Sequence, residues 1–286
     1  MIDRTKHGES MTSKNAWRSV AALAAFAALT TATRADERKF TYVTEPDVLP
    51  KGAVEFEQWI TSELGRDGGD YANWLFREDL EYGFTDRLTA ALYLNFQDEF
   101  FSPDDEEGEA EEKENGLDFK GVSIEAKYQL VNPYKNPVGV LAYFEATTDG
   151  AHEFELEEKL VLGSYGDVWS AALNLVLEQE WEVEHGETEE ESVFEVAAGL
   201  SRRLNANWTA GLEAVHERVY VDGVDFAEEE FSAIFIGPNI HYAVEKWWVT
   251  LTVLPQVYGD GDGSDGDLQL VHSEQVHTRL IAGINF

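Results

Sequence analysis

Cysteine is missing from this 286-residue chain, and basic residues are scarce. Without cysteine, neither disulfide bonds nor thiolate metal sites can form. Lys and Arg together number 21 against 56 Asp and Glu, which gives a formal charge of −35. This acidic excess argues against nucleic acid as a partner, because contacts to phosphate need Lys and Arg. The chain still has 8 Trp, 11 Tyr and 16 Phe, so its composition is that of a folded protein and not of an acidic disordered one.

Long apolar runs are also lacking, apart from Val20 to Leu29 near the N-terminus. Basic residues precede this run, and Thr33-Arg34-Ala35 after it resembles an A-x-A cleavage site. The run is shorter than the roughly 20 residues of a membrane-spanning helix, and its surroundings are typical of a secretory signal peptide. We therefore predict a signal peptide over residues 1–35, with Met11 as an alternative start, and a mature chain of residues 36–286. A buried Ala-rich helix is the competing interpretation.

Beyond residue 35 the dominant pattern is an alternation of apolar and polar residues with a period of two. Val122, Ile124 and Ala126, for example, alternate with Ser123 and Glu125. Such alternation predicts β-strands with one apolar face. Pro238 interrupts the tenth segment, where a bulge or a strand end would suit a proline better than a regular strand. The twelve segments are 52–64, 72–84, 88–100, 118–131, 138–147, 154–164, 168–182, 191–203, 208–220, 230–242, 247–258 and 268–286.

The connections between these segments alternate in length. The even ones are tight turns, such as 84–87 and 205–207, whereas the odd ones are longer and mostly acidic: 65–71, 102–116, 184–191, 221–230 and 259–267. A transmembrane barrel sorts its loops in this way, with short periplasmic turns and longer external loops. A secreted β-sandwich is the alternative, but its strands average nearer 5 or 6 residues. We predict an all-β fold: a transmembrane antiparallel up-and-down β-barrel of about 12 strands, with both termini on the periplasmic side.

The C-terminal sequence TRLIAGINF fits this prediction. Leu280, Ala282, Ile284 and Phe286 fall on one face of an extended chain. A last strand that ends in Phe resembles the C-terminal signal that the barrel assembly machinery of the bacterial outer membrane recognises. We therefore expect the last strand to close the barrel against the first, with Phe286 as the assembly signal.

If the apolar phase of each strand faces lipid, the opposite phase faces the lumen. Its residues carry both signs of charge, and buried charges are costly unless they are paired or hydrated. Two interpretations stay open: an ion-paired network fills a narrow lumen, or the same groups line a water-filled path that selects by charge. Excess acid in such a path would favour cations or polar neutral solutes. The candidate lumen-lining residues are Glu55, Glu57, Arg77, Asp79, Glu81, Asn95, Glu125, Lys127, Glu145, Glu157, Lys159, Glu195, Glu213, His277 and Arg279.

A Gly-rich acidic loop is a candidate Ca²⁺ site. Asp260, Asp262, Ser264, Asp265 and Asp267 offer oxygen ligands at spacings that suit this ion. The loop departs from an EF-hand, because Asp265 stands where the invariant Gly should be and no Glu closes the loop. A solvated acidic turn is the alternative interpretation, and we expect no other cofactor.

Enzymatic function has little support in the sequence. Outer-membrane phospholipases of about this size carry a Ser/His pair, and His272-Ser273 is the adjacent pair of that kind in this chain. Consecutive residues of a strand face opposite sides, so these two cannot act together. We expect a protein that is not an enzyme.

Several stretches together resemble an uncharacterised proteobacterial family of outer-membrane β-barrels. They are EPDVLPKGAVEFEQWIT (45–61), FREDLEYGFTDRLTAALYLN (76–95), ELEEKLVLG (155–163), KWWVTLTVLPQVYG (246–259) and VHTRLIAGINF (276–286). The turn at residues 83–87 is also distantly similar to barrels associated with the meta-cleavage pathway of phenol degradation. The family resemblance implies an outer-membrane location and a barrel fold, but no substrate and no catalytic residues.

These patterns predict a barrel of the bacterial outer membrane through which a small solute passes by passive or facilitated diffusion. The alternative is a plugged barrel with a structural, adhesion or surface-binding role, and a lipid-modifying enzyme comes third. The expected partners are outer-membrane lipid and lipopolysaccharide, the barrel assembly machinery and an unidentified small solute.

Overall fold

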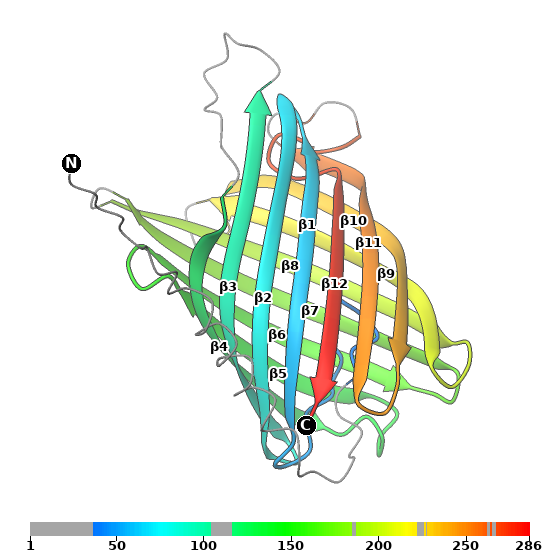
Figure 1. Cartoon of the computed structure of the whole chain (residues 1–286). Coiled ribbons are helices and arrows are strands. Elements are labelled where there is room, and N and C mark those ends of the chain that lie inside the picture. Colours follow the sequence, from blue (N-terminus) through cyan, green and yellow to red (C-terminus); the bar gives the residue numbers. More distant parts are fainter. Residues whose placement is uncertain are drawn as a thin grey trace, which may run out of the picture.

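The computed structural model is a closed barrel of twelve antiparallel strands (Figure 1), as the alternation predicts. It describes residues 37–103, 116–184, 187–221, 226, 228–261, 264 and 267–286; the predicted signal peptide lies outside this part of the chain. Each strand pairs with its neighbours in the sequence, and β12 pairs with β1. The strands are β1 (Val54–Arg66), β2 (Gly69–Thr85), β3 (Leu88–Pro103), β4 (Asp118–Val131), β5 (Gly139–Thr148), β6 (Glu153–Tyr165), β7 (Trp169–Glu184), β8 (Glu187–Arg203), β9 (Trp208–Val221), β10 (Glu228–Ala243), β11 (Trp247–Gly261) and β12 (Val276–Asn285).

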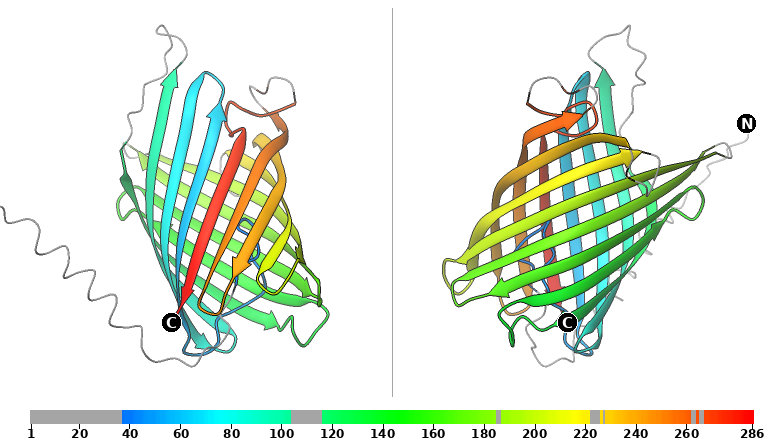
Figure 2. Two further views of the ribbon diagram at one scale, coloured as in Figure 1. Left: turned by 45° about the vertical axis from the view of Figure 1, so that its right-hand side comes forward. Right: turned by 180° about the vertical axis from the view of Figure 1, so that it is seen from behind.

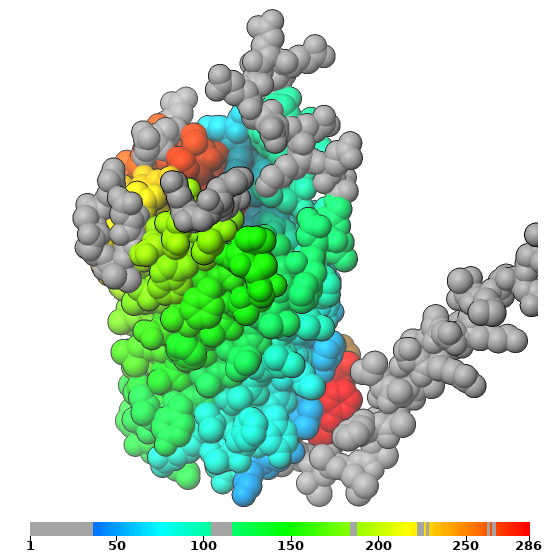
Figure 3. Space-filling model, turned by 90° about the vertical axis from the view of Figure 1, so that its left-hand side faces the viewer, coloured from blue at the N-terminus to red at the C-terminus, as the bar shows by residue number. Residues whose placement is uncertain are grey.

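The wall is apolar outside and polar inside, the reverse of a soluble protein. Leu80 and Ile124 are 52% and 62% exposed on the outer face, whereas Asp79 and Lys127 are at most 1% exposed on the inner face. This arrangement is stable where the outer face meets lipid. Among the described residues no helix is both long and apolar enough to cross a membrane. In the space-filling view, the strands coloured cyan to green form an unbroken outer surface (Figure 3).

Exposed aromatic side chains gather near the strand ends at the short turns. They are Tyr82, Phe84, Trp169, Trp208, Trp247 and Phe286, with exposures from 38% to 53%. Aromatic girdles of this kind mark the interface between lipid and water in outer-membrane barrels. The C-terminus lies at this end, which is the lower end in Figure 1.

β12 closes the barrel in the predicted way. Its pairing with β1 runs from Glu55↔Asn285 to Leu64↔Val276, and the Phe286 N–H donates to the Val54 carbonyl at 3.0 Å. Ile284 and Phe286 are exposed on the outer face, as expected for the lipid-facing phase.

Two of the predicted long connections are shorter than expected. β1 and β2 are joined by residues 67–68 alone, and β7 and β8 by residues 185–186. The first turn is tight because Gly65 and Gly68 adopt positive φ angles of 81° and 87°, which favour glycine. The strands therefore extend into acidic stretches that the sequence pattern predicts to be loops. They tilt strongly across the barrel (Figure 2).

Pro238 does not end its strand, and the predicted start of the last strand was wrong. β10 continues through Pro238, which pairs with Leu212 of β9. Residues 236–238 have no partner in the register with β11, which shifts between Ile234 and Phe235 and resumes at Asn239↔Thr252. The interruption thus affects one neighbour only. β12 begins at Val276 and not near residue 268. Residues 267–275 instead turn into the barrel, where Gln269 is fully buried; we call this segment the inner loop.

Candidate functional site

The first described residues, 37–53, precede β1, and all but the exposed turn at residues 51–52 lie inside the barrel and not in its wall (Figures 1 and 2). We call this segment the plug. Phe40, Val43 and Leu49 are each at most 3% exposed, and Phe40 and Val43 belong to an apolar cluster with Phe235 of β10. A non-regular segment can be buried only if other groups bind its main-chain N–H and C=O groups.

Glu213 of β9 is the main anchor of the plug. Its carboxylate accepts the consecutive main-chain N–H groups of Thr41, Tyr42 and Val43 at 2.7 to 3.1 Å. It also accepts the Thr252 hydroxyl at 2.6 Å. Consecutive N–H groups around one anion form a concave nest. The buried carboxylate therefore fixes the path of the plug at residues 41–43.

Uncharged side chains of the wall bind the plug main chain on both sides of that anchor. The Asn174 amide accepts the Thr44 N–H at 2.7 Å and donates to the Thr44 carbonyl at 2.9 Å. Three further bonds of this kind join Thr89 to the Leu49 N–H, Gln129 to the Pro46 carbonyl and Asn239 to the Lys39 carbonyl. Wall side chains thus replace the water that would otherwise bind these groups.

Glycines on the inner face make room for the plug. A Cβ at Gly199 of β8 would lie 2.7 Å from the Phe40 ring, and one at Gly163 of β6 would lie 2.6 Å from Pro46. Both separations are too short for carbon atoms that are not bonded. The wall is therefore shaped to this segment.

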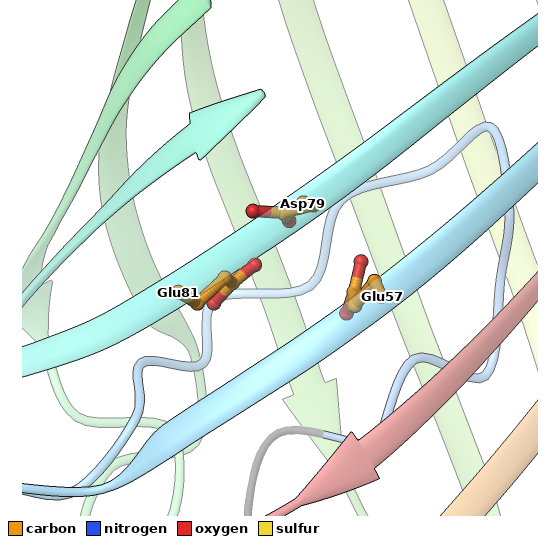
Figure 4. Close-up of side chains that lie close together, drawn as sticks. All are labelled: Glu57, Asp79 and Glu81. Carbon is orange, nitrogen blue, oxygen red and sulfur yellow. The ribbon is translucent and has the colours of Figure 1, made fainter. Parts of the chain in front are cut away.

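Arg38 of the plug enters a cluster of acidic side chains on β1 and β2. Its guanidinium bonds to Glu57 at 3.0 Å and to Glu81 at 3.1 Å, and it lies 4.8 Å from the centre of the Trp59 ring. Lys127 of β4 bonds to the same Glu81 at 2.7 Å. Glu57, Asp79 and Glu81 point toward one another (Figure 4).

A second ion-paired network lies farther along the inner face. Arg77 of β2 pairs with Glu145 of β5 and stacks 4.3 Å from the centre of the Tyr93 ring. Lys159 and Glu157 of β6 pair at 2.9 Å. These contacts hold the long side chains of this second network against the wall and against one another.

The inner loop enters the lumen from the end opposite the plug. Glu274 binds Arg66 and accepts a bond from His277 at 3.0 Å. Burial raises the pKa of Glu274, but His277 and Arg66 outweigh it and leave the pKa below its usual value. The His277 ring stacks 6.4 Å from that of Tyr42 in the plug, and Arg279 lies 4.1 Å from the centre of the Tyr42 ring. Tyr42 of the plug and Glu274 of the inner loop therefore both contact His277 of β12.

The inner face of β6, β7 and β8 is strongly acidic. Glutamates stand opposite one another across adjacent strands, as in Glu157↔Glu178, Glu155↔Glu180 and Glu180↔Glu191. Like charges in such pairs are destabilising, so their presence needs a reason other than stability. The pairs lead to a pocket of about 560 Å³ lined by Glu180, Glu182, Thr188, Glu189, Glu190, Glu191 and Val221.

At the turn end, the plug borders a pocket of about 750 Å³ whose lining includes Lys39, Asp47, Tyr134 and Tyr165. Lys39 pairs with Glu45 at 2.8 Å, and the Tyr165 hydroxyl donates to Asp47. Burial raises the pKa of Asp47 to about 6, against the opposing effect of Lys39.

The structure places the predicted lumen residues on the inner face, but in different roles. Glu57, Asp79, Glu81 and Lys127 form the cluster around Arg38, Arg77 and Glu145 pair with each other, and Glu213 binds the plug. The other candidates line the inner face with them: Glu55, Asn95, Glu125, Glu157, Lys159, Glu195, His277 and Arg279.

The candidate Ca²⁺ loop lies partly outside the described residues, and the His272-Ser273 pair has separate contacts. In the candidate Ca²⁺ loop, Asp260 belongs to β11, whereas Asp262 and Asp265 are not among the residues that the structure describes. His272 and Ser273 turn to different carboxylates: Ser273 donates to Glu217 at 3.2 Å, and His272 lies 3.6 Å from Glu230.

Sequence reasoning missed the plug and with it Arg38, because the stretch before β1 has no period-two pattern. A signal was present in the apolar residues Phe40, Val43 and Leu49, which follow the predicted signal peptide and belong to no strand. Apolar residues in an irregular leader favour burial, and the lumen of a closed barrel can supply it.

The sequence profile of DUF6662, described as a family of unknown function, matches residues 32–159 and 167–286. The chain belongs to this family. The match to DUF6662 covers the plug and nearly all of the wall, so both are part of what the family shares. The predicted resemblance to an uncharacterised barrel family is thereby confirmed. No curated protein sequence matches this DUF6662 chain.

Solved structures of outer-membrane barrels resemble this DUF6662 protein in fold. The COG4313 outer membrane channel from Pseudomonas putida F1 is 12% identical, with a TM-score of 0.60 over 84% of this chain and 97% of that one. The β domain of the Bordetella autotransporter BrkA is 10% identical, with a TM-score of 0.48 over 82% and 99%. The KdgM porin in complex with disordered oligogalacturonate is 10% identical, with a TM-score of 0.46 over 82% and 99%.

Proposed function

We propose that this DUF6662 protein is an outer-membrane channel for small cationic or polar neutral solutes, closed by its own plug. The observation that carries the proposal is the way the plug is held. Side-chain hydrogen bonds and ion pairs, above all those of Glu213 and Arg38, attach it to the lumen. Such bonds exchange with water and can be released, whereas the wall is continuous.

The acidic inner face supports the choice of solute. When ionised, the like-charged pairs on β6, β7 and β8 make the lumen negative between the plug and the pocket lined by Glu180 and Glu191. A negative lumen raises the local concentration of cations and lowers that of anions. The fold similarity to the COG4313 outer membrane channel agrees with this proposal. The phenol-pathway similarity of residues 83–87 remains a prediction.

A barrel that stays plugged and serves a structural, adhesion or surface-binding role is the alternative. The close fit of Gly199 and Gly163 to the plug favours it, because a permanent plug would select for such complementarity. A lipid-modifying enzyme is third, and the separation of His272 from Ser273 in their contacts weighs against that pair as its centre.

Planar-bilayer conductance of the refolded mature protein tests the proposal. The natural chain lacks cysteine, so a Thr44→Cys/Asn174→Cys pair can lock the plug where Asn174 binds the Thr44 main chain. We expect cation-selective steps after reduction of this disulfide and silence after its oxidation. A variant without residues 37–48 should conduct continuously, and a natural-sequence sample treated with the same reagents is the matched control. Silence from a folded barrel without the plug would refute the channel proposal and favour the alternative function.

The remaining partners follow from location in the outer membrane. We propose that lipid and lipopolysaccharide surround the apolar outer face, and that the barrel assembly machinery recognises the last strand with Phe286. Ca²⁺ in the loop of residues 260–267 stays a proposal. Its test is the effect of Ca²⁺ on a variant with Asp262→Asn and Asp265→Asn.

A further inference from the structure

Three acidic side chains converge at the point where Arg38 enters the wall. Glu57 of β1 stands directly opposite Asp79 of β2 in the strand register, and Glu81 follows two residues later on the same face. One carboxylate oxygen from each lies within 4.8 Å of the other two (Figure 4). Carboxylate oxygens so close repel one another unless a proton or a cation lies between them.

Asp79 has no partner for either carboxylate oxygen among the described residues, although its side chain is fully buried. The Oε2 atom of Glu81 is also buried without a hydrogen-bond partner. The other oxygens of the three residues are engaged: Glu57 binds Arg38 and the Trp59 indole N–H, and Glu81 Oε1 binds Arg38 and Lys127. Buried polar atoms are normally satisfied, so three free oxygens on adjacent side chains indicate a missing ligand.

The charges around this point do not balance. The cluster contains five carboxyl groups, each at most 1% exposed, and two cationic groups that bind them, Arg38 and Lys127. With all groups ionised the cluster has a net charge of −3. The five acidic residues are Glu55, Glu57, Asp79, Glu81 and Glu125. A single proton on Asp79 could be donated to Glu81 Oε2, but it would leave the other Asp79 oxygen without a partner and a net charge of −2.

We propose that Glu57, Asp79 and Glu81 bind a hard divalent cation, Ca²⁺, at the base of the plug. Asp79 would supply both oxygens, Glu81 its free Oε2 and Glu57 a third carboxylate. Ca²⁺ accepts several carboxylates in an irregular arrangement, whereas Mg²⁺ demands near-octahedral geometry and keeps several waters. Zn²⁺ prefers the nitrogen and sulfur ligands that this cluster lacks. The site is separate from the acidic loop at residues 260–267.

The cation would also strengthen the hold on the plug. Glu57 and Glu81 bind Arg38 directly, so a cation that orders their carboxylates also orders the binding site of the guanidinium. Loss of the cation would leave the carboxylates to repel one another beneath the plug. The inference does not depend on the channel function, because a permanently plugged barrel would contain the same site.

Metal content and thermal stability of the folded, full-length mature barrel test the proposal. After EDTA treatment and addition of Ca²⁺, we expect about one equivalent per chain to survive gel filtration. At a hundredfold excess over Kd, the cation should raise Tm by roughly 5 °C. Asp79→Asn keeps the shape of the side chain but should abolish both effects. Glu155→Gln, an inner-face acid outside the cluster, and Asp262→Asn/Asp265→Asn in the loop are matched controls that should keep them.

Two results would overturn the inference. The first is that the natural-sequence barrel retains no Ca²⁺ and shows no change in Tm, while the Asp79→Asn barrel is more stable than the natural one. Asp79 would then be a protonated, neutral acid that needs no cation. The second is an Asp79→Asn barrel that still responds to Ca²⁺ like the natural sequence. If Asp79→Asn fails to fold, Tb³⁺ luminescence excited through Trp59, which donates to Glu57 at 2.8 Å, decides the question. Ca²⁺ should quench it by competition, and Trp59→Phe should lower it several-fold. A signal that Trp59→Phe leaves unchanged would place Tb³⁺ elsewhere and refute the site.

Discussion

Substitution of Glu213 by Gln should release the plug while leaving the barrel intact. The change removes one charge and replaces one acceptor oxygen by an NH₂ group, which cannot accept a hydrogen bond. Oxygen Oε2 accepts the N–H groups of Tyr42 and Val43 at 2.7 and 3.1 Å. If the NH₂ group takes this position, both N–H groups lose their acceptor.

The magnitude follows from these two bonds. A hydrogen bond to a charged group contributes about 1.5 to 3 kcal/mol, so the docking free energy of the plug should fall by about 3 to 6 kcal/mol. Since 1.4 kcal/mol corresponds to a factor of ten, the ratio of released to docked plug should rise by about two to four orders of magnitude.

Chemical labelling of a cysteine in the plug measures this ratio. Thr44 is 8% exposed when the plug is docked, so Thr44→Cys should react with a polar maleimide only after release. Labelling should be at least a hundredfold faster with Glu213→Gln, in line with the lower end of that range. Glu155→Gln, which changes an inner-face acid away from the plug, should not accelerate it. Equal labelling rates with and without Glu213→Gln would refute the assignment of Glu213 as the anchor.

Three further predictions address fit, pH and charge. Gly199→Leu should release the plug because its side chain would overlap the Phe40 ring, and adding Phe40→Ala should restore slow labelling. Burial raises the Asp47 pKa to about 6, whereas a released plug would have the usual value near 3.8. Docking is then stronger by up to about 3 kcal/mol at pH 4 than at pH 7. The open probability of the channel should therefore rise as the pH increases from 4 to 7, and Asp47→Asn should abolish this rise. In a barrel without the plug, Glu157→Lys should reduce the cation preference in a salt-gradient reversal potential, and an unchanged potential would exclude Glu157 from the path.

The wall could be predicted because each strand shows its own alternation of apolar and polar residues in the sequence. Segments such as Val122 to Tyr128 must place apolar side chains in lipid and polar ones inside, and a period of two admits no other arrangement. Closure was predictable for the same reason, since the alternation continues to Phe286. The ends of strands were less predictable, because acidic residues such as Glu182 and Glu189 continue the ladder beyond the apolar part.

The inner surface was predictable in composition but not in contacts. Alternation places Glu213 and Asn174 on the inner face, yet nothing local distinguishes an acid that binds main-chain N–H groups from one that lines water. Those groups belong to residues about 130 to 170 positions away in the chain. Only the three-dimensional path of the plug brings them together. The inner loop was misread for a similar reason, because the alternation around Gln269 also suits a segment buried within the lumen.

The plug also reaches across the line where the chain's first and last strands meet. Arg38 bonds to Glu57 of β1, and its carbonyl accepts the Thr250 hydroxyl of β11. Arg279 of β12 donates to the Thr41 carbonyl at 3.3 Å. A sheet that has not yet closed cannot offer these groups together, so the plug can dock fully only after assembly is complete. Once docked, the plug joins β1, β11 and β12 through these contacts, so separation of β1 from β12 would first require the contacts to break.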